Sequence, residues 1–393
     1  MTQQHKTQSL RFDDGTVQFR QRIVVSLLSH KPLLIRNIRS NDLQHPGLKD
    51  YEACFLRLID KMTNGTKLEI NSTGTQLRFK PGTLLGGSLT HECPPSRSIG
   101  WFVEGILPLA PFGKEALELE MEGITDGLCE LDAPSCDYWK KASGPLFANF
   151  GIGIDEDEDL QPGIEILQRA SVAPSEDETT NTEGYTGRVR LVCPIVKPSL
   201  QSIDWTDPGK IKRIRGNSIS TKIVSSSMAA RVAYTAKGVF HKLLPDVWIH
   251  TDVHTIKRNR CGSNPGLSMV VWSESTTGVT LTAECCLSST TDERKELPED
   301  LGTRGACMLL EEIRRGGCID TASQSLAFLW MALSPEDVSR IRIGTLSQYS
   351  IETLRLIKNA LGVEFKVTPD LESKTVLLSC LGTGYRNMAR AST

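Results

Sequence analysis

Residues 345–367 read TLSQYSIETLRLIKNALGVEFKV, and this stretch decides which fold we expect. Its apolar residues recur at steps of three and four between Ile351 and Leu361, which predicts a helix with one buried face. Gly362 then ends the helix, and the alternating apolar residues of VEFKV predict a half-buried strand. The stretch therefore predicts a helix that leads directly into a strand.

The same unit occurs near the start of the chain, at residues 51–70, YEACFLRLIDKMTNGTKLEI. Tyr51 aligns with Tyr349, the letters LRLI occur in both helices, and Gly65 aligns with Gly362 after one deletion. A helix core, a helix breaker and a strand that match in one register indicate an internal repeat. Small units of this kind bury their apolar faces by stacking on further copies.

The remaining pattern predicts an α/β (α+β) fold of three repeats, each a four-stranded sheet with two helices. A smaller α/β insert domain precedes the third repeat, because residues 211–285 predict a strand, a helix and three further strands bounded by polar segments. A chain of 393 residues is also too long for one hydrophobic core. We place the first repeat at 1–85, the second at 86–198, the insert at 199–287 and the third repeat at 288–393.

Composition excludes several classes of protein. The 45 basic and 47 acidic residues give a net charge of −2, so any contact with RNA must be local rather than a general basic coating. The 11 cysteines are scattered and include no CxxC pair, which is typical of a reducing compartment. The most apolar run, residues 99–112, is interrupted by Glu104 and Pro108, so we expect no membrane partner.

Several long blocks resemble the RNA 3′-terminal phosphate cyclases, and most closely the non-cyclising eukaryotic branch of that family. The blocks are RQRIVVSLLSHKPLLIRNIR (20–39), HPGLKDYEACFLRLIDKMTNGT (45–66), RFKPGTLLGGS (78–88), TDPGKIKRIRGN (206–217), LPEDLG (297–302), LLEEIRRGGCIDTASQSLA (309–327) and LGTGYRN (381–387). The resemblance covers essentially the whole chain and implies the same arrangement of three repeats and one insert.

The resemblance also places the family's catalytic position in this sequence. The cyclases adenylylate a histidine just before the last large helix, and the alignment puts Tyr349 there. A phenol, with an ordinary pKa near ~10, is a much poorer carrier of a nucleotide than imidazole. No histidine lies between residues 288 and 393 that could replace it. We therefore expect no cyclase activity.

Two glycine-rich segments of the family are altered as well. The N-terminal glycine loop corresponds to Asp13-Asp14-Gly15-Thr16-Val17, with only the following arginine kept, as Arg20. A second glycine signature would fall within residues 168–188, where acidic residues separate the glycines. Close approach of backbone to phosphate needs those glycines, so we expect no nucleotide cofactor.

Two basic clusters in the insert are candidate docking sites for a partner or for RNA. The clusters are Lys210, Lys212, Arg213 and Arg215, and Lys257, Arg258 and Arg260. The first cluster is either an edge strand protected by its charges or a site for RNA phosphates or an acidic protein segment. Both interpretations stay open at this point.

Other polar groups give weaker signals. His250 and His254 would lie about 13 Å apart on a strand, too far for one ion, and His91 with Cys93 lacks further ligands at a recognisable spacing. Glu311, Glu312, Arg314, Arg315 and Asp320 form a charged cluster whose helical spacing predicts surface ion pairs. We expect no metal site.

The resemblance implies a catalytically inactive assembly factor of the small-subunit processome, required for 18S pre-rRNA processing in the nucleolus. It implies a ribosome-assembly GTPase, the U3 snoRNP and other processome components as partners, and allows contact with pre-rRNA. The alternative is a site-specific endonuclease that cuts pre-rRNA in the same pathway.

Overall fold

The computed structural model describes residues 9–127, 134–153, 160–171, 187–221, 226–254, 261, 266–287 and 296–387. Three of its four-stranded sheets share one topology, in which two parallel strands are followed by two antiparallel ones. In each of these sheets the strand that comes last in the sequence lies third in the strand order. The fold is therefore mixed α/β with a threefold internal repeat, as the sequence predicts.

The strands of the three repeats follow the same order in each sheet. The first sheet consists of β1 (Leu10–Phe12), β2 (Leu33–Ile35), β5 (Leu77–Lys80) and β4 (Lys67–Ile70). The second consists of β7 (Gly87–Glu92), β8 (Leu117–Gly123), β10 (Gly187–Cys193) and β9 (Gly163–Gln168). The third consists of β11 (Asp204–Trp205), β16 (Val338–Ile343), β18 (Thr375–Leu381) and β17 (Lys366–Asp370). Two short strands, β3 (Thr63–Asn64) and β6 (Thr83–Leu84), form a separate pair.

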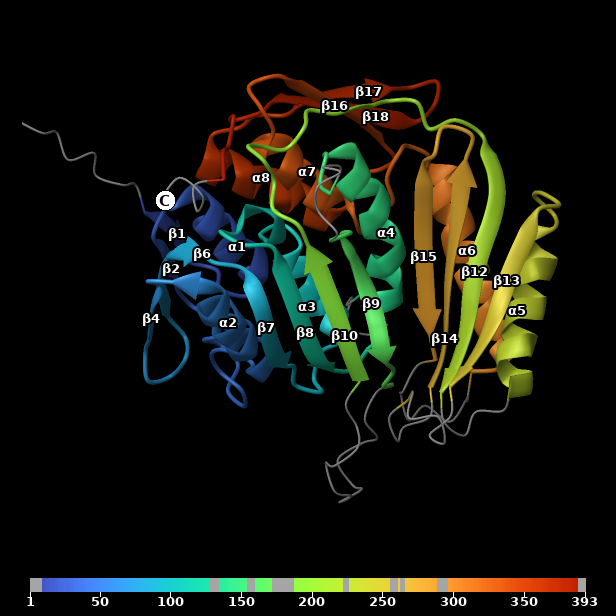
Figure 1. The fold of residues 1–393 in the computed structure, drawn as a ribbon, viewed down its shortest axis with the longest axis horizontal. Helices are drawn as coiled ribbons and strands as arrows, with labels where there is room; N and C mark the ends of the chain where they lie inside the picture. The colour runs from blue at the N-terminus through green and yellow to red at the C-terminus, as the bar shows by residue number, and fades with distance from the viewer. Residues whose placement is uncertain are drawn as a thin grey trace, which may run out of the picture.

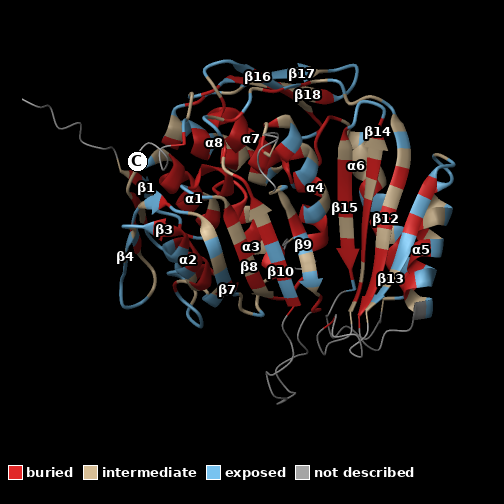
Figure 2. Ribbon diagram, viewed as in Figure 1, coloured by how far each residue is buried: buried red, intermediate tan, exposed pale blue. Residues whose placement is uncertain are grey.

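The helices lie between the sheets, which face outward (Figure 1). The repeats contribute α1 (Phe19–Ser29), α2 (Asp50–Met62), α3 (Ile99–Ile106), α4 (Cys136–Asn149), α7 (Gln324–Leu333) and α8 (Gln348–Leu361), with a short 3₁₀ turn, η1 (Ala110–Phe112). In β8, buried Leu117, Leu119 and Met121 alternate with outward glutamates, so each sheet turns one apolar face to the helices (Figure 2).

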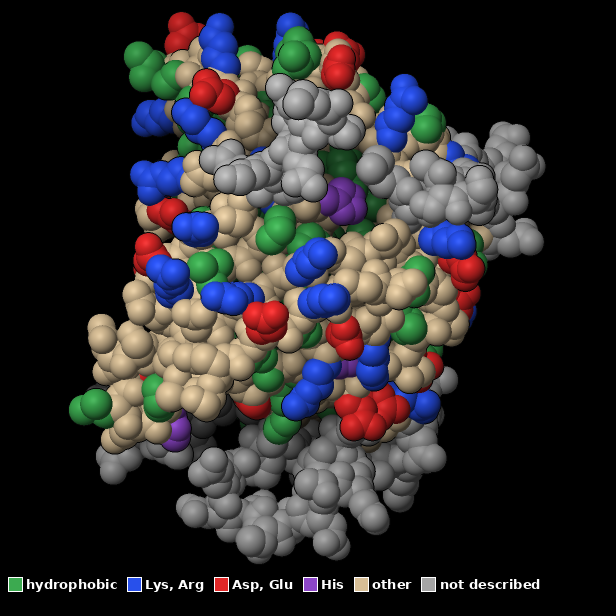
Figure 3. All heavy atoms as spheres, turned by 90° about the vertical axis from the view of Figure 1, so that its left-hand side faces the viewer, with side chains coloured by type: hydrophobic (Ala, Val, Ile, Leu, Met, Phe, Trp, Pro, Cys, Tyr) green, Lys and Arg blue, Asp and Glu red, His purple; other side chains and the backbone are tan. Residues whose placement is uncertain are grey.

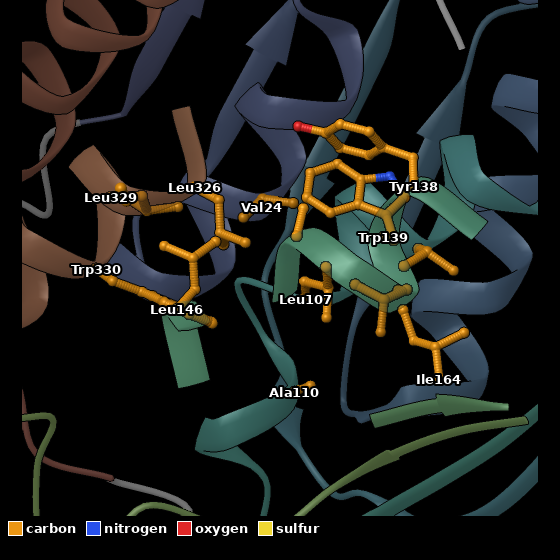
Figure 4. Packing of buried hydrophobic residues seen from close by; sticks show 14 of the residues in the cluster. Val24, Leu107, Ala110, Tyr138, Trp139, Leu146, Ile164, Leu326, Leu329 and Trp330 are labelled. Carbon is orange, nitrogen blue, oxygen red and sulfur yellow. The ribbon is translucent and has the colours of Figure 1, made fainter. Parts of the chain in front are cut away.

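Helix α7 is the centre of the core. Each of its ten residues is buried, as expected of a helix that is apolar on all sides. Leu326, Leu329 and Trp330 of α7 lie near Val24 of α1 and Leu146 of α4 (Figure 4). One hydrophobic core therefore joins helices from all three repeats.

Helix α8 forms as the opening stretch predicts. The Ser347 side chain caps its start by accepting a hydrogen bond from the Ser350 N–H at 3.0 Å. Gly362 adopts a left-handed conformation with φ of 76° and ends the helix. Gly65 has no such role in α2, which already ends at Met62. The matched glycines therefore mark the same turn region without capping both helices.

The strand after α8 differs from its prediction. Val363 is buried and Phe365 partly buried, but β17 begins only at Lys366, and Val367 is 48% exposed. The reason is that β17 is the edge of the third sheet and pairs only with β18, so it lacks cover on its outer side.

The fourth sheet forms the insert. It consists of β13 (Val247–His254), β12 (Ile211–Thr221), β14 (Gly266–Ser275) and β15 (Thr280–Cys286), with α5 (Ser226–Phe240) and α6 (Pro298–Arg315) packed on one face (Figure 1). β12 pairs with β13 only from Ile214 onward, so Arg215 lies inside the sheet, whereas Ile211 to Arg213 pair with β14 alone. The interpretation of this cluster as a protected edge strand is therefore wrong at Arg215 and stays a prediction for the residues before it.

Two elements lie outside the units in which the sequence places them. We assigned the helix that ends at Arg315 to the third repeat, but α6 starts at Pro298 and packs on α5, β14 and β15 of the insert. Strand β11, assigned to the insert, pairs with β16 of the third repeat. Which segments fold independently stays a prediction.

The face of the molecule at the left of Figure 1 has mixed charge. Figure 3 shows that Lys and Arg side chains alternate there with Asp and Glu side chains. On the first sheet, for example, Arg78 lies 3.6 Å from Glu69. No helix in the described part of the chain has the length and apolarity to cross a bilayer.

Candidate functional site

A cleft of about 1010 Å³ lies where the three repeats and the insert meet. Its lining includes Tyr51 at the start of α2, Tyr349 at the start of α8, and residues of α1, α3 and α6. The two tyrosines that mark the sequence repeat therefore enter the same cleft from two repeats. We take this cleft as the candidate site.

Three side chains hold the Tyr349 hydroxyl in the cleft. The hydroxyl donates to Glu104 Oε1 at 2.7 Å and accepts from Arg20 Nη2 at 3.3 Å. The Gln21 side chain also contacts the hydroxyl. Arg20 and Glu104 form an ion pair at 2.6 Å and are both largely buried. Helices α1, α3 and α8 thus meet at one phenol.

This arrangement keeps the Tyr349 phenol protonated. Burial, followed by the neighbouring charge of Glu104, raises the pKa of Tyr349 well above its ordinary value. A phenol attacks phosphorus as its phenolate, so the site opposes the ionisation that a nucleophile needs. Arg20 would favour the phenolate, but its charge is already paired with Glu104.

Most arginines of the cleft are neutralised by carboxylates. Arg39 contacts Glu52 at 2.6 Å. The other two pairs are Arg304 with Glu296 at 2.9 Å and Arg315 with Glu312 at 2.8 Å. Each pair lowers the attraction of the cleft for a phosphate, because an incoming anion must compete with a carboxylate that is already in place.

Arg97 is the exception among the cleft arginines. It stacks on the Tyr51 ring with its guanidinium 4.4 Å from the ring centre, and Tyr51 in turn contacts Trp101 edge-on at 5.1 Å. In the described part of the chain no carboxylate lies within ion-pair distance of Arg97, and its Nε has no hydrogen-bond partner. Its Nη2 donates to the Tyr51 hydroxyl at 3.4 Å, so among the described arginines of the cleft Arg97 is the one whose charge no carboxylate neutralises.

The N-terminal loop, residues 13–17, reaches this cleft at Thr16, which is one of its lining residues. The Asp14 carboxylate accepts hydrogen bonds from the Thr16 N–H at 3.1 Å and from the Thr16 hydroxyl at 2.6 Å. These bonds lower the pKa of Asp14, which is therefore ionised at neutral pH. The Asp14 carboxylate therefore already binds the Thr16 N–H, which is the kind of donor that a glycine loop would offer to a phosphate.

The first basic cluster is only partly available to a partner. Arg213 pairs with Glu274 at 2.5 Å and Arg215 with Asp246 at 2.8 Å. Lys210 and Lys212 are exposed. The second cluster, Lys257, Arg258 and Arg260, lies outside the described residues.

The remaining candidates occupy structural positions. His254 contacts Asp252 at 2.8 Å and buried Arg169 at 3.1 Å. His91 contacts Cys54 at 3.1 Å, and burial lowers the pKa of His91 to about 4. Glu311 pairs with Arg314 and Arg315 within α6, as the helical spacing predicts.

Asp320, from the same charged cluster, is buried and joins three parts of the structure. It accepts hydrogen bonds from the Tyr138 hydroxyl of α4, from the Thr282 N–H of β15 at 3.1 Å and from the Ser323 N–H at 3.1 Å. Burial outweighs these donors and raises the pKa of Asp320 to about 6. The sequence did not distinguish this buried carboxylate from the less buried members of the cluster.

We expect the stability of the protein to depend on pH through Asp320. Because its folded pKa of about 6 lies above the ordinary aspartate pKa of 3.8, folding favours the protonated form. Its stabilising contribution is greatest below the unfolded pKa and is lost as the pH rises through about 6, by about 3 kcal/mol. Chemical denaturation from pH 4 to pH 7 should show this loss in the parent and not in Asp320→Asn. Equal slopes in the two proteins would contradict the prediction.

The chain matches a known protein family. A profile described as RNA 3′-terminal phosphate cyclase matches residues 12–367. This chain belongs to the RNA 3′-terminal phosphate cyclase family. The family assignment made from the quoted sequence blocks is confirmed.

Similar proteins cover nearly the whole chain. The probable RNA 3′-terminal phosphate cyclase-like protein of Dictyostelium discoideum is 45% identical over 389 residues, which is 96% of this chain and 98% of that protein. The RNA 3′-terminal phosphate cyclase-like protein of Homo sapiens is 41% identical over 377 residues, 94% and 95% of the two chains. The rRNA processing protein rcl1 of Schizosaccharomyces pombe is 37% identical over 387 residues, 98% and 99% of the two chains.

Three residues of the site escaped the sequence analysis. The sequence indicated Glu104 only as an interruption of an apolar run, although its carboxylate accepts a hydrogen bond from the Tyr349 hydroxyl. Gln21 and Arg97 lie within helix and loop sequences that carry no motif. A signal for Glu104 was present, since a lone carboxylate in an apolar helix needs a buried partner.

Proposed function

We propose that this chain is a catalytically inactive, cyclase-fold assembly factor of the small ribosomal subunit, acting in the processome during 18S pre-rRNA processing. The observation that carries the proposal is Tyr349. It stands where the alignment places the nucleophilic histidine, and Arg20 and Glu104 hold it as a neutral phenol. The bonds between Asp14 and Thr16 in the altered loop give further support.

The relative named for rRNA processing supports the pathway. On this proposal the protein acts in the nucleolus, bound to a ribosome-assembly GTPase and to the U3 snoRNP with other processome components. It needs no nucleotide cofactor of its own. The unpaired Arg97 is consistent with contact between the protein and pre-rRNA.

The alternative is a site-specific pre-rRNA endonuclease. The charged cluster that would supply its catalytic groups does not favour it. Glu311 is bound by Arg314, Glu312 by Arg315, and Asp320 by Tyr138. A purified chain that cuts a pre-rRNA transcript at one site, and loses the cut on a single substitution, would establish the endonuclease instead.

The first test measures nucleotide transfer. We expect no covalent adduct when the purified chain is incubated with radiolabelled ATP, and no cyclisation of a 3′-phosphorylated oligonucleotide. Tyr349→His should also form no adduct, because the altered N-terminal loop remains. A labelled band on the unmodified chain would overturn the claim of inactivity.

The second test separates a scaffold from an enzyme in cells. Depletion of the protein should cause 18S precursors to accumulate, and a Tyr349→Phe copy should restore processing as well as the parent copy. The phenyl ring keeps the packing and removes the hydroxyl, which a scaffold does not use chemically. Normal 18S processing without the protein contradicts the proposed pathway, and failure of Tyr349→Phe alone contradicts inactivity.

A further inference from the structure

The insert sheet has one face that the helices α5 and α6 do not cover. Val247 and Ile249 of β13 are buried toward α5, so Trp248 and His250 point to the opposite face. Helix α4 packs on the β15 and β14 side of that face. In Figure 1 the β12 and β13 side stands in front of its helices, and Figure 2 shows much of β13 as exposed.

One row across this open face combines aromatic and cationic side chains. Arg215 of β12 is in register with Trp248 of β13 on one side and Trp272 of β14 on the other. Residues in register on neighbouring strands lie close enough to share a ligand. The row therefore places Arg215 between two tryptophans, with its guanidinium turned to Asp246 just before β13.

The two tryptophans differ in access. Lys141 of α4 lies 4.4 Å from the Trp272 ring centre and covers it. Trp248 is 56% exposed, an unusual exposure for so large an apolar side chain, and its Nε1 contacts His250 at 3.3 Å. Lys237 lies 5.7 Å from the Trp248 ring centre. Trp248 thus offers an accessible ring with cations near it.

Basic and acidic side chains meet at this face. Arg213 pairs with Glu274 and Arg215 with Asp246, whereas Lys141 lies over the Trp272 ring and Lys237 near the Trp248 ring. Asp252, further along β13, is paired with His254. Lys237 is the cation beside the exposed ring, and in the described part of the chain no carboxylate lies within ion-pair distance of it, so a polyanion is the occupant that fits.

We propose that this open face binds single-stranded RNA, with a base stacked on Trp248 and a backbone phosphate near Lys237. Exposed aromatic rings on a sheet, flanked by cations, suit unpaired bases, whereas double-stranded RNA keeps its bases stacked inside the helix. An acidic peptide could use the cations but would leave the exposed ring without a role. The proposal rests on the proposed role in pre-rRNA processing, which brings RNA to the protein.

Fluorescence anisotropy with a labelled 12-nucleotide oligouridine tests the proposal on the full chain. Trp248→Ala should weaken binding roughly 5- to 150-fold, the range typical of a lost base–aromatic stack. Trp248→Phe should keep most of the affinity. The matched control is Tyr234→Ala, which removes a ring that is 82% exposed on α5 rather than on the open face of the sheet, and should change nothing.

The contrary outcomes are distinct. If Trp248→Ala and Tyr234→Ala bind alike, or if a base-paired hairpin or a polyglutamate peptide binds better than oligouridine, the inference is wrong. Cell complementation separates this result from the proposed function. If the parent protein restores 18S processing but does not bind oligouridine, the proposed function holds and the proposed RNA-binding face is wrong. If the parent protein plays no part in 18S processing, the proposed function is wrong.

Discussion

Asp137→Ala is expected to lower the free energy of unfolding of the full chain by about 3–5 kcal/mol. Asp137 of α4 forms a two-pronged ion pair with Arg169, at 2.6 and 2.9 Å, and both residues are more than nine-tenths buried. Without the carboxylate, the Arg169 charge stays buried and uncompensated. Because Arg169 also contacts His254 of β13, the loss should loosen the joint between the second repeat and the insert.

Urea denaturation measures this loss, and a matched pair provides the control. Glu299→Ala removes an equally two-pronged partner from Arg231, at 2.6 and 2.7 Å, but both side chains of that pair are exposed. Water can replace the lost carboxylate there, so we expect little change. If both variants unfold at the same urea concentration, burial is not what makes the Asp137 pair important.

The second large effect concerns helix α6 and the insert. A fragment of residues 207–316 should fold cooperatively, and a fragment of residues 207–287, which lacks α6, should not. Leu301, Ala306 and Leu309 of α6 are fully buried in the structure. A Cβ on Gly305 would lie 2.3 Å from the Met269 side chain and 2.5 Å from Cys285 Sγ, so the helix lies directly on the sheet.

Amide dispersion in NMR and a melt followed by circular dichroism distinguish the two fragments. Without α6, the β14 and β15 face loses its cover, and a sheet with α5 alone buries too little apolar surface to offset the entropy of ordering. A cooperative melt of the shorter fragment would show instead that the insert ends before α6.

Local sequence patterns predicted much of the fold. The period of apolar residues placed α8 around Ile351 to Leu361, because the residues of its buried face recur at helical spacing within its own sequence. The repeat of residues 51–70 at the end of the chain indicated the shared topology of the sheets.

Of the candidate site, the sequence by itself determined the family. It also predicts that Tyr349 stands in place of the family's histidine and that the glycine loop is changed, since these predictions depend only on which residue stands at an aligned position. Only the tertiary structure decided what surrounds them. Glu104 meets Tyr349 from another repeat, Asp246 neutralises Arg215, and α6 covers the insert. A helix pattern predicts that one face is buried. Which residues pack on that face, and which charge lies opposite a given side chain, depends on residues that the fold brings together from distant parts of the chain.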